Sequence, residues 1–142
     1  MLTRKPAVTA IRVLVVDDSS FMRGAIARHI QKDARFQVVG VAVNGREAVV
    51  KAMELRPDVI TMDVEMPEMD GLTAAAMIRG LEEGGNTRVP ILAMTAHVVN
   101  SVKEQCLDAG MDGYISKPIQ PAELYQALET YCPHLRSEPS CP

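Results

Sequence analysis

Short apolar segments alternate along the chain with segments in which apolar residues recur at the period of a helix. Three of the apolar segments are nearly continuous in Val, Ile, Leu and Met, which is typical of strands that are covered on both faces. The pattern predicts five strands, over residues 12–16, 37–43, 58–62, 91–95 and 113–116.

A helical pattern follows each predicted strand. The first runs from Phe21 to Ile30 and places its apolar side chains, Phe21 included, on one face. The last runs over residues 124–131 with the same kind of spacing. Two shorter patterns follow the Asn-Gly and Asp-Gly pairs that end at Gly45 and Gly71.

The remaining helix is predicted between the fourth and fifth strands. Val98, Val99, Val102 and Cys106 have the spacing of one helical face. The helix should end near Gly110, because glycine readily adopts the left-handed conformation found just after many helices.

Strict alternation of strands and helices predicts an α/β fold with a doubly wound parallel sheet and helices on both faces. Right-handed crossovers bring all the strand ends to one edge of the sheet, where ligands of open α/β sheets bind. We expect one domain over residues 11–133. Residues 1–10 and 134–142 show no pattern and are predicted to be N-terminal and C-terminal tails.

Composition and charge exclude several classes of protein. The chain has 142 residues, of which 47% are hydrophobic and 23% are charged, and its net charge is −3. These values are ordinary for a globular domain and give no broad attraction to nucleic acid or to an anionic membrane. No apolar stretch approaches the ~20 residues that span a bilayer, and the N-terminus does not have the pattern of a signal peptide.

The cysteines predict a reducing environment. Cys106, Cys132 and Cys141 are odd in number and widely spaced, which argues against a disulfide framework and favours a cytoplasmic location. Cys132, His134 and Cys141 also form a conceivable set of metal ligands. With no matching second pair, a tail is the better interpretation of that segment.

Polar residues stand at the ends of four predicted strands. Asp17 and Asp18 end the first, Asp63 ends the third, Thr95 ends the fourth, and Lys117 follows the fifth. The fold would gather them into one crevice, where three carboxylates repel one another unless a cation lies between them. Oxygen ligands of this kind suit Mg²⁺. A carboxylate nucleophile that accepts a phosphoryl group from a reactive donor needs such a cation, a lysine, a hydroxyl and little else.

Each of these residues also has an ordinary structural interpretation. The Asp17-Asp18 pair could cap the first helix, and the residues after Asp63 are turn formers. Threonine is common in strands, as Thr95 would be, and Lys117-Pro118 could simply precede the last helix. The coincidence of four strand ends that carry complementary groups favours the functional interpretation.

Four segments give the chain a family resemblance. The sequences VLVVDDSS (13–20), DVEMPEMDG (63–71), MTA (94–96) and GYISKPI (113–119) resemble those of response-regulator receiver domains, and the resemblance runs from about residue 12 to residue 131. It implies a flavodoxin-like strand order of 2-1-3-4-5. It also implies a domain that catalyses only its own phosphorylation and dephosphorylation and is otherwise not an enzyme.

The resemblance implies a role for each residue of the crevice. Asp63 would be the phosphoacceptor. Asp17, Asp18, Asp63 and the backbone carbonyl of Glu65 would bind Mg²⁺ as the cofactor. Thr95 and Lys117 would contact the phosphoryl oxygens, and the Lys117-Pro118 peptide would be cis.

Two further roles concern signalling. Tyr114 resembles the aromatic switch that turns inward when Thr95 moves, so that the fourth helix, fifth strand and fifth helix would form the output surface. Glu65 and His97 lie two residues beyond Asp63 and Thr95 and are predicted to tune the phosphoryl lifetime. For His97, a solvated position at the start of the fourth helix is the alternative.

Different parts of the chain resemble different branches of the family. Residues 12–79 are most similar to chemotaxis regulators, including methylesterase receivers, and residues 90–119 to receivers of hybrid histidine kinases. The expected partners are a sensor histidine kinase or a histidine phosphotransfer protein, and a downstream protein target. We expect no nucleic acid or membrane partner, and a monomer or weak dimer. The sequence does not identify the kinase, the target or the signal.

Two other functions compete with this interpretation. A haloacid-dehalogenase-type phosphatase also uses Asp, Mg²⁺, Thr and Lys, but its D-x-D motif follows the first strand and its acidic pair comes last, which is the reverse of the order here. A pseudo-receiver that binds partners without phosphorylation usually lacks one of the five key groups, and this sequence keeps all five.

Overall fold

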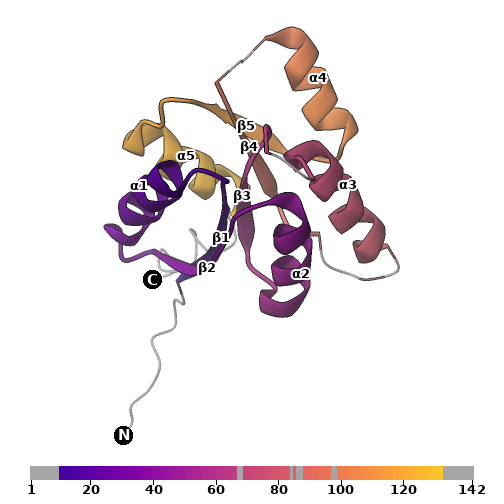
Figure 1. Cartoon of the computed structure of the whole chain (residues 1–142). Helices are drawn as coiled ribbons and strands as arrows, with labels where there is room; N and C mark the ends of the chain where they lie inside the picture. Colours follow the sequence, from indigo (N-terminus) through magenta and orange to yellow (C-terminus); the bar gives the residue numbers. More distant parts are fainter. Residues whose placement is uncertain (1–9, 67–68, 84, 86–87, 97–98, 133–142) are drawn as a thin grey trace, which may run out of the picture.

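The computed structural model describes residues 10–66, 69–83, 85, 88–96 and 99–132, and strands and helices alternate along this part of the chain (Figure 1). The elements are β1 (Ile11–Val16), α1 (Ser20–Gln31), β2 (Phe36–Ala42), α2 (Gly45–Leu55), β3 (Val59–Asp63), α3 (Gly71–Glu82), β4 (Ile91–Thr95), α4 (Asn100–Asp108), β5 (Gly113–Ser116) and α5 (Pro121–Tyr131). Every predicted element is therefore present, and the strand bounds differ from the predicted ones by at most one residue.

The strands form one parallel sheet in the order β2-β1-β3-β4-β5. This confirms the doubly wound α/β fold and the strand order 2-1-3-4-5. All five residues of β3 and all five of β4 are buried, which explains why their sequences are largely apolar; besides the polar residue that ends each strand, the one polar residue in them is Thr61.

Two apolar cores cover the two faces of the sheet. On one face, α1 and α5 contribute Ile26, Ile30, Leu124 and Leu128. On the other face, α2 and α3 contribute small side chains such as Ala52 and Ala75, and α4 contributes Cys106. Figure 1 shows α1 and α5 together on one side of the sheet, with α2 and α3 on the other. No helix in the described ranges is long and apolar enough to cross a membrane.

Helix α1 begins with a serine cap rather than with an aspartate. The Ser19 hydroxyl accepts a hydrogen bond from the Met22 amide at 3.2 Å, and a side-chain oxygen at this position satisfies an otherwise unpaired helix amide. Asp17 and Asp18 are therefore not the caps of α1, and their carboxylates are left for the crevice.

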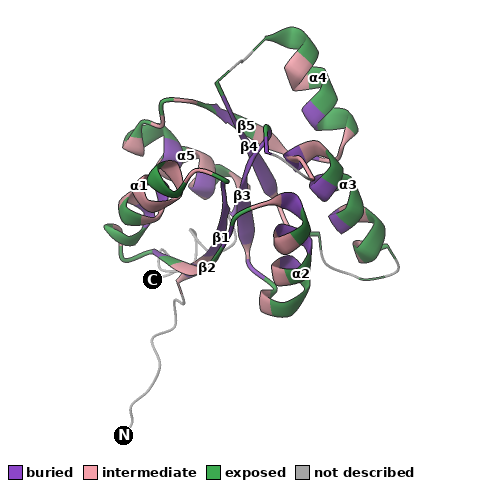
Figure 2. Cartoon of the chain, in the orientation of Figure 1, coloured by how far each residue is buried: buried purple, intermediate pink, exposed green. Residues whose placement is uncertain are grey.

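Two apolar residues that the helical patterns placed on buried faces are exposed. Phe21 is 75% exposed, and Val99 is 53% exposed and precedes α4 as its N-cap residue. Both stand near the carboxyl edge of the sheet, beyond the strands that would cover them. Figure 2 shows α4 mostly exposed, and Cys106 is its buried residue. The predicted end of α4 is confirmed, since Gly110 follows it with a φ of +99°.

Cys132 lies in the apolar core and not in a tail. Its side chain is fully buried with residues of α1 and α5, so the tail interpretation is wrong at this position. His134, Cys141 and the two predicted tails lie outside the described residues.

Candidate active site

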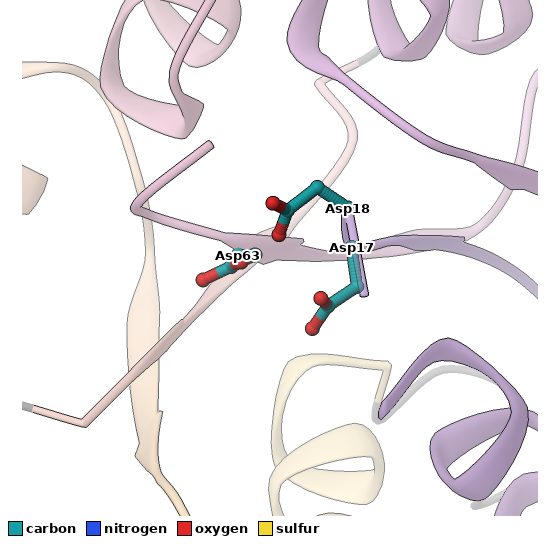
Figure 3. A group of neighbouring side chains, drawn as sticks. All are labelled: Asp17, Asp18 and Asp63. Atoms are coloured by element: carbon teal, nitrogen blue, oxygen red, sulfur yellow. The ribbon is translucent and has the colours of Figure 1, made fainter. Parts of the chain in front are cut away.

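Three carboxylates meet at the carboxyl ends of β1 and β3. One oxygen from each of Asp17, Asp18 and Asp63 lies within 4.8 Å of the others (Figure 3). Asp17 and Asp63 are buried, whereas Asp18 is exposed at the mouth of the group. The gathering of these residues, which sequence analysis predicted from the parallel sheet, is confirmed.

Three groups of Asp17 are held by hydrogen bonds: its amide, its carbonyl and one carboxylate oxygen. Its amide donates to the Ala42 carbonyl at 3.1 Å, and its carboxylate oxygen Oδ1 accepts from the Ser19 amide at 2.9 Å. Its own carbonyl oxygen accepts from Nη1 of Arg23 at 2.9 Å. The main chain and one carboxylate oxygen of this residue are thus fixed by β2, by Ser19 and by α1.

Lys117 brings a positive charge to the buried carboxylates. Its Nζ lies 3.1 Å from Oδ1 of Asp63 and 3.4 Å from Oδ2 of Asp17. The Lys117 amide donates to the Thr95 carbonyl at 2.9 Å, and the Lys117-Pro118 peptide is cis, as predicted. The end of β4 therefore anchors the lysine that faces the acidic group.

The charges in the crevice perturb one another. Burial raises the pKa of Asp63 to about 6, the neighbouring Asp17 carboxylate adds to this, and Lys117 opposes it. Burial alone would lower the pKa of Lys117, but the Asp17 and Asp63 carboxylates outweigh it and raise that pKa. Carboxylate repulsion thus persists in spite of the lysine, and a further cation would relieve it.

The donor set fits a divalent cation. Oδ2 of Asp17 is buried and has no hydrogen-bond partner among the described residues, although Lys117 stands nearby. An ionised oxygen in this position carries a large desolvation cost unless a cation or a hydrogen bond compensates it. Three carboxylates with oxygen ligands alone match the preference of Mg²⁺. The carbonyl of Glu65 remains a predicted ligand, while its amide donates to Oδ1 of Asp63 at 3.3 Å.

Thr95 and Tyr114 lie on the same face of the neighbouring strands β4 and β5. Thr95 of β4 pairs with Ser116 of β5, and Ala93 pairs with Tyr114. Tyr114 is two residues before Ser116, and residues two apart in a strand point to the same face. Thr95 is buried, whereas Tyr114 is 45% exposed, and Nζ of Lys103 lies over its ring, 4.8 Å from the centroid. The ring is thus on the outside of the molecule, with a lysine of α4 over it.

An open hollow of about 540 Å³ adjoins the crevice between β3, α3 and α4. Glu65 and Thr95 line it together with Val102 and Gln105 of α4. Glu65 is exposed there, and its place beside the path of water to Asp63 stays a prediction. His97, the other residue predicted to tune the phosphoryl lifetime, lies outside the described residues.

Sequence analysis did not identify three residues that contribute to this region. Ser19 orients Asp17 as well as capping α1, Arg23 bonds the Asp17 carbonyl, and Lys103 covers Tyr114. The cap could have been recognised from a serine just before a helical pattern. The other two contacts join a side chain to a carbonyl or a ring, and no residue spacing indicates such contacts.

Comparison with known proteins places the chain in a family. Residues 13–129 match the model of the response regulator receiver domain. The chain is 45% identical over 111 residues to a protein-glutamate methylesterase/protein-glutamine glutaminase of Vibrio parahaemolyticus, a match that covers 78% of this chain and 29% of that protein. The chain thus spans less than a third of the length of the curated relatives it matches.

Solved structures agree with this match. The chemotaxis protein CheY4 of Vibrio cholerae has a TM-score of 0.78 at 33% identity, covering 87% of this chain and 99% of that one. The receiver domain of a sensor histidine kinase from Pseudomonas aeruginosa has a TM-score of 0.76 at 34% identity, covering 87% and 98%, and was solved with a magnesium ion coordinated in its active-site cleft. The resemblances to chemotaxis regulators and to kinase receivers are both confirmed.

The acidic group, the parallel sheet and the extent of the family match all support one assignment. The match begins within β1 and ends within α5, so it includes every element that carries a residue of the crevice. The chain belongs to the response regulator receiver family of two-component signalling, and its pocket of Asp17, Asp18 and Asp63 is typical of receivers that accept a phosphoryl group.

Proposed function

We propose that Asp63 accepts a phosphoryl group from a phosphohistidine of a sensor histidine kinase or a histidine phosphotransfer protein. The observation that carries the proposal is the position of the Asp63 carboxylate between the Asp17-Asp18 pair and Nζ of Lys117. The phosphoryl group brings further negative charge to this nucleophile, so the site needs cations: Lys117 is one, and the Asp17-Asp18 pair would bind another.

The transfer itself is a displacement at phosphorus. An oxygen of Asp63 bonds to phosphorus while the phosphorus–nitrogen bond of the donor breaks, and the electron pair of that bond stays on the imidazole nitrogen. Asp63 must be ionised to attack, and a pKa near 6 leaves most of it ionised at neutral pH even without a metal. Nζ of Lys117 lies 3.1 Å from Oδ1 of Asp63, and after the transfer it would form an ion pair with the phosphoryl oxygens.

The other residues of the crevice complete the site. Asp17 and Asp18, with Asp63 and the Glu65 carbonyl, would hold Mg²⁺. Bound there, the ion would neutralise negative charge on the phosphoryl group. The Thr95 hydroxyl would donate a hydrogen bond to a phosphoryl oxygen. Glu65 and His97 would set the lifetime of the phosphorylated state by orienting or repelling the water that hydrolyses it.

The output would be a change in surface structure rather than in metabolism. Movement of Thr95 toward the phosphoryl group would leave space that the Tyr114 ring can fill, and α4, β5 and α5 would present the altered surface to a downstream protein. The exposed ring of Tyr114 in this structure is compatible with the starting state of such a switch. We further propose that residues 11–133 form the receiver unit and that the remaining residues are tails.

The relatives leave room for a larger protein. Methylesterase and glutaminase activities are named for curated proteins more than three times as long as the matched segment, so these activities are not assigned to this chain. Within the matched segment, the proposed chemistry is limited to phosphorylation and dephosphorylation of Asp63.

Incubation with acetyl phosphate and Mg²⁺ tests the proposal. The intact protein should gain the mass of one phosphoryl group, which should be stable in acid and labile in base. Asp63→Asn should gain none, while Asp70→Asn should still gain it, because Asp70 caps α3 outside the acidic group. Phosphorylation that persists in Asp63→Asn would contradict the assignment of the acceptor. A native protein that never gains the mass would favour a pseudo-receiver.

A further inference from the structure

Arg23 contacts the acidic group through a main-chain oxygen and not through a carboxylate. The residue lies in the first turns of α1, and its side chain reaches back over the β1–α1 turn. Nη1 of Arg23 donates a hydrogen bond to the main-chain carbonyl of Asp17, at 2.9 Å and in a partly buried position. The guanidinium thus bonds the backbone of an acidic residue, and its partner there is not the carboxylate.

This contact fixes a peptide plane. The Asp17 carbonyl and the Asp18 amide belong to one planar group, so that holding the carbonyl oxygen also restrains the backbone from which Asp18 starts. The other side of Asp17 is already fixed, because its amide and its Oδ1 are both hydrogen-bonded. With Arg23 bonded as well, the direction in which the Asp18 side chain leaves the turn is set by the fold.

Asp18 depends on this restraint more than its neighbours do. Lys117 forms ion pairs with Asp17 and Asp63, but within the described residues no ion pair or hydrogen bond holds the Asp18 carboxylate. Asp18 is also exposed, so that repulsion from two carboxylates within 4.8 Å would drive it outward into water. Backbone geometry is what keeps it directed at the group.

We propose that Arg23 is a positioning residue for the cation site: by bonding the Asp17 carbonyl it holds the Asp17-Asp18 peptide so that the Asp18 carboxylate faces Asp17 and Asp63 before a metal binds. The inference rests on the proposed function, because it takes Asp18 as a ligand of Mg²⁺. Arg23 itself touches neither the metal nor the phosphoryl group in this proposal. Its contribution is to reduce the loss of conformational freedom when the ion binds.

The test compares Mg²⁺ affinity in variants that separate the hydrogen bond from the charge. Arg23→Met removes both and should weaken Mg²⁺ binding by about 3- to 10-fold, the range that one hydrogen bond supports. Arg23→Lys keeps the charge and one donor, so its affinity should lie between those of Arg23→Met and the native protein. Arg28→Met removes the same charge from an exposed position later in α1 and should bind Mg²⁺ as the native protein does.

A second readout is independent of the metal. In metal-free protein, the NMR shift of the Asp17 carbonyl carbon and that of the Asp18 amide should change in Arg23→Met and stay near the native values in Arg28→Met. Calorimetric titration with MgCl₂ then gives the affinities. Equal affinities in Arg23→Met and Arg28→Met, or an unchanged Asp17 carbonyl shift, would overturn the inference alone. A native protein that binds no Mg²⁺ would overturn both this inference and the proposed cation site.

Discussion

The acidic pocket is bordered by two regions that are built differently. On the α1 side, the helix has a side-chain cap at Ser19, its residues Ile26 and Ile30 are fully buried, and Arg23 ties it to the end of β1. On the α4 side, the helix has no side-chain cap bond, and Cys106 is its one buried residue in the described structure.

The difference suggests that the α1 side holds the cation-binding residues in place and that the α4 side changes structure on phosphorylation. The Asp17-Asp18 pair, which would hold the cation in a fixed geometry, lies on the side with dense packing and hydrogen bonds, where reorganisation would cost most. The side that is expected to move has few buried contacts, an exposed tyrosine and a hollow beside it, which are features of regions with low local stability. Four experiments test how far this contrast extends.

Truncation of core residues should give the largest effect and the clearest contrast. Ile30→Ala in α1 should lower the free energy of unfolding by about 2–5 kcal/mol, because Ile30 is fully buried. Val102→Ala in α4 should cost less than about 1 kcal/mol, because Val102 is only partly buried. Urea unfolding of both variants gives these values. Similar losses would mean that α4 is as firmly packed as α1.

The pH dependence of stability should show the strain on Asp63. Its pKa in the folded protein is about 6, against an ordinary value of 3.8, so the folded state holds the proton more tightly than the unfolded chain does. The stability that protonated Asp63 contributes to the folded state is complete below about pH 3.8 and is lost as the pH rises through about 6.

Without metal, Asp63→Asn should therefore gain stability over the native protein as the pH rises from 4 to 7, by an amount of the order of 2 kcal/mol. Thermal or urea unfolding of the two proteins across this range measures the difference. If the difference between them does not change with pH, Lys117 compensates Asp63 fully and burial has no net effect on its proton.

Asp18 should cost stability and make metal binding possible. Asp18→Asn removes one of three clustered charges, and in metal-free buffer it should raise the free energy of unfolding by up to about 1 kcal/mol, since the carboxylate is exposed to solvent. With Mg²⁺ at about 100 times its dissociation constant, the native protein should gain roughly 2.7 kcal/mol, and the variant much less. Thermal melts in EDTA and in millimolar Mg²⁺ distinguish these cases. Equal responses to Mg²⁺ would show that Asp18 is not a ligand.

The smallest effect should come from the lysine over the Tyr114 ring. A cation in this position stabilises an exposed aromatic ring by about 0.5–1 kcal/mol. Lys103→Gln should shift the Tyr114 ring toward the interior, whereas Lys103→Arg keeps a cation and should resemble the native protein. Ring NMR signals of Tyr114 in the absence of phosphoryl analogues measure the shift. Identical ring signals in the two variants would show that the charge at position 103 does not determine where the Tyr114 ring lies.

The sequence predicted the fold and the residues of the pocket because both depend on the same regularity. The strands β1, β3 and β4 are largely buried and apolar, and each ends in or is followed by a polar residue. Parallel strands must bring Asp17, Asp63, Thr95 and Lys117 to one edge of the sheet. The cis peptide at Lys117-Pro118 followed from the family resemblance.

The errors arose where the sheet ends. Helical spacing placed Phe21 and Val99 on apolar faces, but the first turns of α1 and α4 stand at the edge of the sheet and have little beneath them to pack against. The spacing of apolar residues does not show how far the sheet extends. For the same reason, it did not reveal how weakly α4 is buried.

The most direct test of the contrast is an NMR spectrum of the native protein with Mg²⁺, recorded before and after addition of beryllofluoride, an analogue of the phosphoryl group. We expect amide shifts to change at Asp63 and at the other proposed ligands of the cation. We also expect changes across α4 and around Tyr114. The core of α1 around Ile26 and Ile30 should remain nearly unchanged. Changes confined to the pocket, or changes that are as large in α1 as in α4, would contradict the division between a fixed chemical side and a responsive side.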